Sequence, residues 1–406
     1  MTVLLGGALL IKPALAISQL AIDVDKSWQG PTPTHTPAWA CFAYQNRKKI
    51  TVAGSIAGAL TDYQMVLTIH WGFGVDSGSD IYLNQKCQGD FADIRFTNNA
   101  GTLLQYFVDG YTTAGQAKVW IKVDSIPASL GTVDIWLYFN NWADLSASYG
   151  AGTFIIFNAG NTLVGWTDLT VAGAGNIDWT IVAAKIRATA SAINAAAFFY
   201  CNTVTGINSY KVHAHILAQD GLTASDYRQG LVHKLAQDNV DKAKAYWKDS
   251  TNTWIIEDEA AGTDSSGADA TFDATLDHEY ILRRLPTQSD LLVDSLLKVT
   301  HLKGGWSPQT IGLYARLAAN AHWADFYNIF VAKYADPEPT FSAFGADESY
   351  DTFYGVTTLK ELAAAMNKGD MLFSNGVTLA KITPGPIGTE LTTHDVGADP
   401  TWAYPP

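Results

Sequence analysis

The sequence predicts an all-β protein in which two consecutive antiparallel β-sandwich or jelly-roll domains lie between short N- and C-terminal assembly segments. Short runs of alternating apolar and polar residues, separated by turn residues, recur along the middle of the chain. Charged residues make up only 16% of the 406 residues, whereas 34 glycines and 48% hydrophobic residues favour turn-rich β-structure with a large interior. We expect four parts: residues 1–38, 39–153, 154–346 and 347–406.

The charge and the cysteine content exclude several classes of protein. A net charge of -13 argues against nucleic acid and anionic membranes as partners, because both require clustered Lys and Arg. The three cysteines, Cys41, Cys87 and Cys201, form an odd count without Cys-x-x-Cys spacing, so we predict neither a disulfide framework nor a zinc site from them. We expect small buried hydrophobic residues at these positions.

Residues 1–38 combine an apolar arm with a proline-spaced linker over residues 30–37. The run from Leu4 to Ala16 lacks a preceding basic residue and is interrupted by a Lys-Pro pair, which is atypical of a secretory leader. It is also shorter than the roughly 20 apolar residues that span a bilayer. We expect residues 3–11 to be an ordered arm that packs against another surface, with an uncleaved leader as the alternative. The contact residues are Leu4, Leu5, Leu9 and Leu10.

Residues 39–153 show the alternation of a half-buried sheet. In residues 117–123, Val119, Ile121 and Val123 occupy one face and two lysines occupy the other, which indicates an antiparallel strand with one solvated face. The predicted strands are residues 49–52, 63–69, 94–97, 117–123 and 133–139.

Several motifs in this part resemble the DUF2341 family. The motifs are residues 46–52, 60–64, 93–97, 119–123, 125–127 and 137–141. The resemblance implies a β-sandwich module of the kind found in microbial surface proteins and phage proteins. It implies no catalytic residues.

Residues 154–346 again form short apolar runs. Their order, and the closing segment 325–334 followed by Pro337-Glu338-Pro339, resemble a concanavalin A-like, laminin-G-type jelly roll. Residues 235–246 fit a helix, a long loop or a single turn. The predicted strands are residues 177–188, 195–200, 210–217, 227–234, 245–248, 253–257, 278–284, 311–316 and 326–334.

Paired carboxylates are the residues that could form a hydrolytic site. Retaining glycosidases hold two carboxylates about 5 Å apart, and Glu257 and Glu259 have the spacing of one strand face. They precede the Gly- and Ser-rich stretch 260–267, where we expect a hairpin loop, so we interpret them as a solvated acidic loop. We predict no catalytic residues and no enzyme activity.

Two groups of residues, one of histidines and one of acidic residues, could bind a metal ion, but neither has the spacing of a dedicated site. His213 and His215 share a strand face, and His233 lies on a strand that could pair nearby, but no carboxylate or cysteine completes the set in the sequence. We predict no metal site and no cofactor, with a structural calcium ion as the alternative. The candidate calcium ligands are Asp264, Asp269 and Asp273.

Tryptophans near strand ends are the candidates for ligand binding. Exposed aromatic rings hold sugar rings through their faces, whereas a single tryptophan more often anchors a sandwich core or the root of a loop. The candidates are Trp247, Trp254, Trp306 and Trp323.

Residues 347–406 predict a short helix and small hairpins. Thr358 and Glu361 form a capping box, and Gly369 ends the helix. Residues 371–374 and 377–382 flank an Asn-Gly turn, which predicts a hairpin. These features, with a Gly-rich turn and a final Pro-x-Trp, resemble a cassette of phage tail-fibre proteins. The residues expected to drive assembly are Leu359, Leu362, Met366, Leu372, Phe373 and Trp402.

Together these patterns favour a non-catalytic virion structural protein of a phage, of the tail-fibre, tail-associated or decoration type. Hairpins this small need neighbours to be stable, so we expect a homo-oligomer, with a trimer favoured, that also contacts other virion proteins. The sandwiches would mediate adhesion, with host-surface glycans as the expected ligands. Two alternatives stay open: a cell-surface filament or adhesin subunit assembled by strand addition, and a glycan hydrolase of jelly-roll fold.

Overall fold

The computed structural model shows two compact units, one formed by residues 43–347 and one formed by residues 1–42 with 348–406. The described residues are 40–41, 43–170, 175–192, 195–202, 209–219, 227–235, 242–258, 263–302, 310–317, 321–350, 371–374, 379–382, 390–392 and 401–403.

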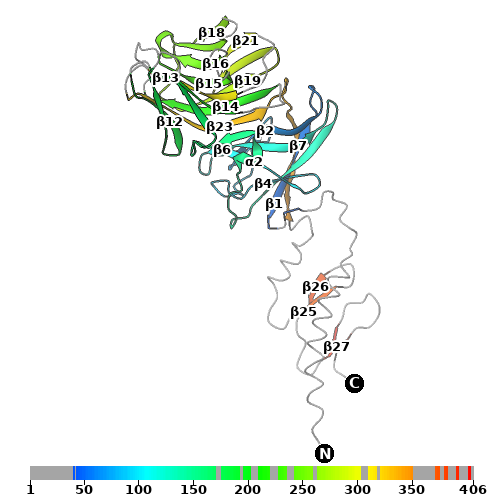
Figure 1. Cartoon of the computed structure of the whole chain (residues 1–406). Helices are drawn as coiled ribbons and strands as arrows, with labels where there is room; N and C mark the ends of the chain where they lie inside the picture. The colour runs from blue at the N-terminus through cyan, green and yellow to red at the C-terminus, as the bar shows by residue number, and fades with distance from the viewer. Residues whose placement is uncertain are drawn as a thin grey trace, which may run out of the picture. The chain divides into compact units, whose positions relative to one another are not determined.

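The first sandwich packs a five-stranded sheet against a four-stranded sheet (Figure 1). Most neighbouring strands run antiparallel, as predicted, whereas β3 pairs in parallel with β2. The five-stranded sheet has the order β24 (Phe341–Ser349), β1 (Asn46–Ala53), β8 (Thr132–Phe139), β4 (Arg95–Asn98) and β5 (Leu103–Leu104). The four-stranded sheet has the order β3 (Asp80–Tyr82), β2 (Leu60–His70), β7 (Gln116–Ile126) and β6 (Tyr106–Tyr111).

The second sandwich is larger and is antiparallel in both sheets, which confirms the predicted all-β class. One sheet has the order β10 (Trp166–Thr170), β13 (Ala195–Asn202), β22 (Thr310–Leu317), β15 (Arg228–Leu235), β16 (Lys242–Lys248), β17 (Thr253–Asp258) and β18 (Thr263–Ala268). The other has the order β11 (Ile177–Val182), β12 (Lys185–Ala190), β23 (Trp323–Lys333), β14 (Tyr210–Ala218), β19 (His278–Arg284), β20 (Gln288–Val293) and β21 (Leu296–Leu302), with β9 (Ile156–Asn158) also paired to β23. Two short helices, α2 (Gly150–Thr153) and the 3-10 turn η1 (Asp249–Thr251), complete the described elements of this unit.

Strand alternation builds a separate core inside each sandwich. Val119, Ile121 and Val123 of β7 all face the first core, as the sequence predicted. On the opposite face of β7, however, Trp120 is also buried. The expectation of a solvated face is wrong at this position because the second sandwich covers it.

The polypeptide returns to the first sandwich after completing the second. The side chain of Asn46 donates a hydrogen bond to Asp347 over 2.7 Å, and Ser342 Oγ donates one to the Thr51 carbonyl over 3.2 Å. Strand β24 is thereby an edge strand of the five-stranded sheet. The expected boundary at residue 346 therefore falls inside a strand of the first sandwich, and the jelly roll is an insertion before this last strand.

Two local expectations for the second sandwich are wrong. Residues 177–188, expected as one strand, form the β11–β12 hairpin, whose turn residues Ala183 and Ala184 have φ of 50° and 57°. Alanine carries no sequence signal for such a turn. Residues 263–267, expected within a loop, belong to strand β18, which pairs with β17. Strand β16 covers the predicted strand 245–248 and also residues 242–244, which were left open between helix and loop.

The two sandwiches meet through their outer faces (Figure 1), where β23 runs close to β2 and near β6 and β7. Phe330 of β23 stacks on Phe154 with ring centroids 3.8 Å apart and meets Trp120 of β7 edge to face at 5.0 Å. We call the buried set Phe107, Trp120, Phe154, Phe330 and Ala332 the aromatic interface.

Polar groups at the same junction are also paired. The amide of Gln64 bridges the two sandwiches, accepting a hydrogen bond from the Lys333 backbone N–H over 2.9 Å and donating one to the Thr153 carbonyl over 2.9 Å. Lys211 is buried beside Trp120 and pairs with Glu338 at 2.9 Å. The junction therefore resembles a domain interior more than a loose contact.

In the terminal unit, the predicted hairpin is present. β25 (Met371–Ser374) pairs with β26 (Leu379–Ile382), and β27 (Glu390–Thr392) pairs with β28 (Thr401–Ala403). Leu372, Phe373 and Trp402 lie on these strands, but their side chains are outside the described part of the chain. The remaining assembly candidates, Leu4, Leu5, Leu9, Leu10, Leu359, Leu362 and Met366, are outside it altogether. Among the described residues, no helix is long and apolar enough to cross a bilayer.

We predict that Phe330→Ala lowers the free energy of unfolding by about 3–5 kcal/mol, because it opens a cavity where three aromatic rings meet. Phe73→Ala is the matched control, since Phe73 is 72% exposed, and it should change stability little. Urea unfolding followed by tryptophan fluorescence measures both. A Phe330 variant as stable as the control would contradict the packing described for the aromatic interface.

Candidate functional site

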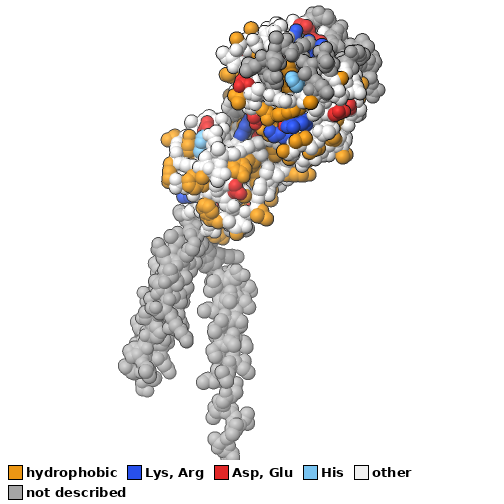
Figure 2. Space-filling model, turned by 90° about the vertical axis from the view of Figure 1, so that its left-hand side faces the viewer, with side chains coloured by type: hydrophobic (Ala, Val, Ile, Leu, Met, Phe, Trp, Pro, Cys, Tyr) orange, Lys and Arg blue, Asp and Glu red, His pale blue; other side chains and the backbone are white. Residues whose placement is uncertain are grey.

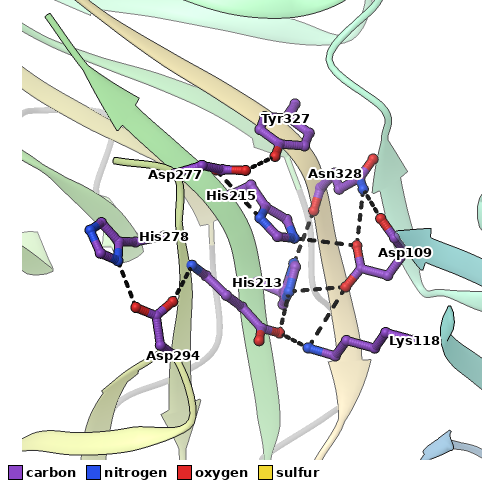
Figure 3. Close-up of polar contacts among 10 residues, drawn as sticks. Asp109, Lys118, His213, His215, Asp277, His278, Asp294, Tyr327 and Asn328 are labelled. Atoms are coloured by element: carbon purple, nitrogen blue, oxygen red, sulfur yellow. Dashed lines mark hydrogen bonds and ion pairs between the residues drawn. The ribbon is translucent and has the colours of Figure 1, made fainter. Parts of the chain in front are cut away.

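A cluster of ionisable side chains adjoins the aromatic interface, between the two sandwiches. The first sandwich contributes Asp109 from β6 and Lys118 from β7, and the second contributes His213 and His215 from β14 and Glu279 from β19. Figure 3 shows Asp109 and Lys118 facing the histidines across the junction. We call these five residues the interface cluster.

Two β-bulges aim residues into the cluster. In β6 the register shifts between Val108 and Gly110, so that Asp109 is the extra residue. In the β14–β23 pair the register shifts between His213 and His215, opposite Asn328, whose φ is 45°. A bulge redirects a side chain without ending the strand, and bulges are enriched beside functional sites.

His213 is held rigidly in a fully buried position. Its ring stacks on Phe330 with centroids 4.0 Å apart. Nδ1 lies 3.0 Å from the Asn328 carbonyl oxygen, which can only accept, so Nδ1 carries a proton. Nε2 is directed at carboxylates instead, 2.7 Å from Glu279 Oε1 and 3.5 Å from Asp109 Oδ2.

Asp109 is nearly as buried, with its side chain 1% exposed. The Asn328 amide donates to both its carbonyl oxygen, over 2.8 Å, and its Oδ1, over 2.9 Å. Trp120 Nε1 donates to Oδ2 over 3.3 Å, and Lys118 Nζ lies 3.8 Å from the same oxygen. A buried carboxylate requires such partners, because burial without them is unfavourable by several kcal/mol.

His215 lies at the solvent side of the cluster. Its ring stacks on Tyr327 at 4.8 Å, its Nε2 is 3.6 Å from Asp109 Oδ1, and its Nδ1 is 3.5 Å from Asp277 Oδ1. The Tyr327 hydroxyl donates a hydrogen bond to Asp277. His215 therefore sits between two carboxylates.

Burial and charge act in opposite directions on the ionisable groups. Burial alone would raise the pKa of Glu279, but contacts with His213 and Lys118 lower it to about 2. The pKa of Asp109 is likewise held below its usual range by His213, His215 and Lys118 despite burial. Burial would lower the pKa of His215, yet Asp109 and Asp277 raise it to about 9. The cluster thus favours ionised carboxylates facing cations.

A pocket of about 270 Å³ opens from solvent onto this cluster. Tyr111 stands at the pocket with 53% of its surface exposed. The full lining is Asp109, Gly110, Tyr111, Thr112, Gln116, Lys118, His215 and Glu279. An aromatic ring beside several hydrogen-bonding groups is the composition expected for a small polar ligand.

Among the described residues, none of the tryptophans predicted to bind a ligand lines this pocket. Trp247 and Trp254 are fully buried in the second core with ring centroids 4.8 Å apart, so the expectation that they bind a ligand is wrong: neither ring face is accessible. Trp323 is half-buried, and the Arg187 guanidinium covers its ring at 3.9 Å. Trp306 lies outside the described residues.

The acidic candidates are engaged in protein contacts. Glu257 is in strand β17, not in a solvated loop, and pairs with Lys244 at 2.9 Å and the Tyr246 hydroxyl at 2.6 Å. Glu259 lies outside the described residues. Asp269 accepts a hydrogen bond from Lys298, and Asp273 accepts one from Thr275, so their oxygens already have protein donors. Asp264 lies on strand β18.

The sequence identified part of the interface cluster. His213 and His215 were expected to share a strand face, and both do reach one site, but the carboxylate that completes the set is Asp109, from the other sandwich. Within the described residues, this trio is the group of His, Cys, Asp or Glu that could hold a metal ion. The side chain of His233 is outside the described part. Asp109 was missed because Asp-Gly reads as a turn, not as a strand residue.

We predict that the cluster stabilises the fold most strongly between about pH 4.5 and 6.5. The depressed pKa of Glu279 contributes stability above its ordinary value of 4.5 that is lost as the pH falls towards about 2. The raised pKa of His215 contributes stability that is complete below 6.5 and lost as the pH rises through about 9. Urea unfolding across this range measures both limbs.

Single substitutions distinguish the acid limb from the alkaline limb of this profile of stability against pH. Glu279→Gln should make the acid limb shallower without removing it, because Asp109 also has a lowered pKa. His215→Gln should flatten the alkaline limb, whereas Asp178→Asn, at an exposed position on β11, should leave both limbs unchanged. A wild-type stability that stays constant up to about pH 10 would contradict the assignment of His215.

Comparison with known proteins gives one family match. A family described as a domain of unknown function (DUF2341) matches residues 90–181, which begin within the first sandwich and end in strand β11 of the second. No curated protein matches the sequence.

Solved structures resemble a little under half of the chain. A protein of unknown function with galectin-like fold from Bacillus subtilis is 10% identical, with 47% of this chain and 97% of that chain covered and a TM-score of 0.36. The carbohydrate-binding module CBM66 from Bacillus subtilis is 15% identical, with 42% and 96% covered and a TM-score of 0.33. The exoplasmic/lumenal domain of VIP36, in a Ca2+/Man2-bound form, is 9% identical, with 42% and 81% covered and a TM-score of 0.33.

Proposed function

We propose that this is a non-catalytic adhesion protein that binds a neutral sugar in the pocket between its two sandwiches. The observation that carries the proposal is the exposed ring of Tyr111 beside a set of hydrogen-bonding side chains in one pocket. A sugar ring has an apolar face that stacks on an aromatic ring and an edge of hydroxyls that needs donors and acceptors. The pocket supplies both.

The size and composition of the pocket favour one small ring. Its volume is just below the roughly 300 Å³ at which small-molecule sites usually begin. Thr112 and Gln116 are exposed neutral hydrogen-bonding groups, while Glu279 and Lys118 are half-buried and pair with each other. On the visible face, Figure 2 shows mostly hydrophobic and uncharged side chains with smaller groups of charged ones among them, in line with the low charge content of the chain. These features favour an uncharged polar ligand.

The charge state of the cluster supports binding without hydrolysis. A glycosidase needs one carboxylic acid that stays protonated at working pH, which requires a raised pKa. The two carboxylates of the pocket, Asp109 and Glu279, have lowered pKa values because cations surround them. Neither is suited to be the proton donor.

The setting proposed for this binding is a phage particle, in which the terminal segments assemble the protein as a homo-oligomer, most simply a trimer, beside other virion proteins. The support is the likeness of residues 369–402 to a tail-fibre cassette and the short strands of the β25–β26 and β27–β28 hairpins, since an isolated two-stranded hairpin is at best marginally stable in water. The sandwiches would then face host-surface glycans. A cell-surface filament subunit assembled by strand addition is the competing setting.

We predict that the purified chain binds members of a neutral glycan array and that Tyr111→Ala weakens this binding about tenfold, or ~1.4 kcal/mol. Tyr149→Ala is the matched control, since Tyr149 is 57% exposed and lies outside the lining of this pocket. Calorimetric titration with the best glycan measures both variants.

Two outcomes would overturn parts of this proposal. Equal losses in both tyrosine variants, or no binding to any glycan, would remove the pocket as a sugar site. Release of reducing sugar that disappears in Glu279→Gln would instead establish a hydrolase.

A further inference from the structure

We propose that Asp109, His213 and His215 bind a divalent transition-metal ion, of the Zn²⁺ or Co²⁺ kind, that links the two sandwiches. One carboxylate comes from β6 of the first sandwich and two imidazoles come from β14 of the second. The site does not depend on a sugar occupying the pocket.

Two nitrogen–oxygen distances in this trio, each to a different oxygen of Asp109, are too long for direct hydrogen bonds and lie in the range between two ligands of one metal ion. His213 Nε2 lies 3.5 Å from Asp109 Oδ2, and His215 Nε2 lies 3.6 Å from Asp109 Oδ1. Hydrogen bonds of this type span about 2.7–3.2 Å. Ligands bound at about 2.0–2.2 Å in a tetrahedron are instead about 3.3–3.6 Å apart. One ligand atom from each of the three residues lies within 4.8 Å of the others.

The surrounding groups orient these side chains as metal ligands usually require. The proton on His213 Nδ1 points to the Asn328 carbonyl, which leaves Nε2 as the nitrogen that faces the site. The Asn328 amide fixes Asp109 through its Oδ1 and its carbonyl oxygen. One residue, placed by the bulge in β23, therefore positions a ligand from each sandwich.

The donor set selects the class of ion. Two imidazoles with one carboxylate suit zinc, cobalt, nickel or iron, whereas calcium and magnesium prefer oxygen ligands. Three protein ligands leave a further coordination position. Asp109 and His215 both line the pocket, which provides an entry path from solvent and room for that position.

Two neighbours must move for the ion to bind, and each imidazole nitrogen that binds it must release its proton, because the metal ligand is the neutral ring. Lys118 Nζ lies 3.8 Å from Asp109 Oδ2, and its side chain is 31% exposed, so it can turn into the pocket. Glu279 Oε1 lies 2.7 Å from His213 Nε2 and must release this nitrogen. The released carboxylate stays within reach as a further oxygen ligand. Three nearby carboxylates, Asp109, Asp277 and Glu279, offset the positive charge of the ion.

The test titrates Zn²⁺ alone into the full chelator-treated chain by calorimetry, without sugar, and records the visible spectrum with Co²⁺ as a second probe. We expect one ion per chain bound at this site, a tetrahedral-type Co²⁺ spectrum and a higher unfolding temperature. His215→Gln and Asp109→Asn should weaken binding by about 100-fold or more, and Asn328→Gly, which keeps the positive φ but removes the amide, by about 10- to 100-fold.

The matched control is His278→Gln. His278 lies in the same sandwich and pairs with Asp294 at 2.6 Å, so its loss should leave the affinity unchanged. Far-UV circular dichroism without metal checks that each variant folds. If a variant does not fold, the Co²⁺ spectrum of the wild type tests the proposed coordination instead. Absence of stoichiometric binding by the wild type, or affinity that survives both His215→Gln and Asp109→Asn, would overturn the proposal. Sugar binding is measured separately, so its failure would leave this result intact.

Discussion

Burying the outer faces of two sheets against each other is the constraint on which the rest of this structure depends. A sandwich normally hides one face of each sheet and leaves the other in water. Here the outer faces of β7 and β23 are themselves covered, because Trp120 and Phe330 pack together between the sandwiches. Every polar group that lies beside these rings then has to find a protein partner.

The interface cluster is the consequence of that requirement. His213 sits on the outward face of its strand, where water would ordinarily solvate it, yet it is fully buried by the first sandwich. Asp109 faces His213 from the first sandwich, and its side chain is almost as completely buried. A buried carboxylate and a buried imidazole stabilise each other only when geometry and hydrogen bonds are good, and two β-bulges with Asn328 provide that geometry. The same arrangement leaves a pocket at the rim, since domain junctions rarely close completely.

Strand β24 explains why the junction is a permanent part of the molecule. The chain passes from the first sandwich into the second after α2. It leaves the second sandwich at the end of β23 and then adds β24 to the edge of the five-stranded sheet of the first sandwich. Both connections across the junction are therefore covalent and short. A ligand or ion bound there would meet residues from both sandwiches in one prearranged position, which lowers the entropy lost on binding.

Much of the fold was predictable because strand alternation is a local property. The prediction for β7 placed Val119, Ile121 and Val123 on the core face, and the structure agrees. The β11–β12 hairpin was missed because Ala183 and Ala184 adopt positive φ without a glycine or asparagine. Trp247 and Trp254 were misassigned because aromatic residues serve cores and binding surfaces equally well, and only burial distinguishes the two roles.

The sequence by itself determined the all-β class, the positions of most strands, and the placement of His213 and His215 on one face of a strand. These features follow from residue alternation within about ten positions. Only the tertiary structure decided that Asp109 and Lys118 would meet those histidines. These partners are roughly a hundred positions apart on different sandwiches, and no local pattern encodes a contact made when two outer faces are packed together.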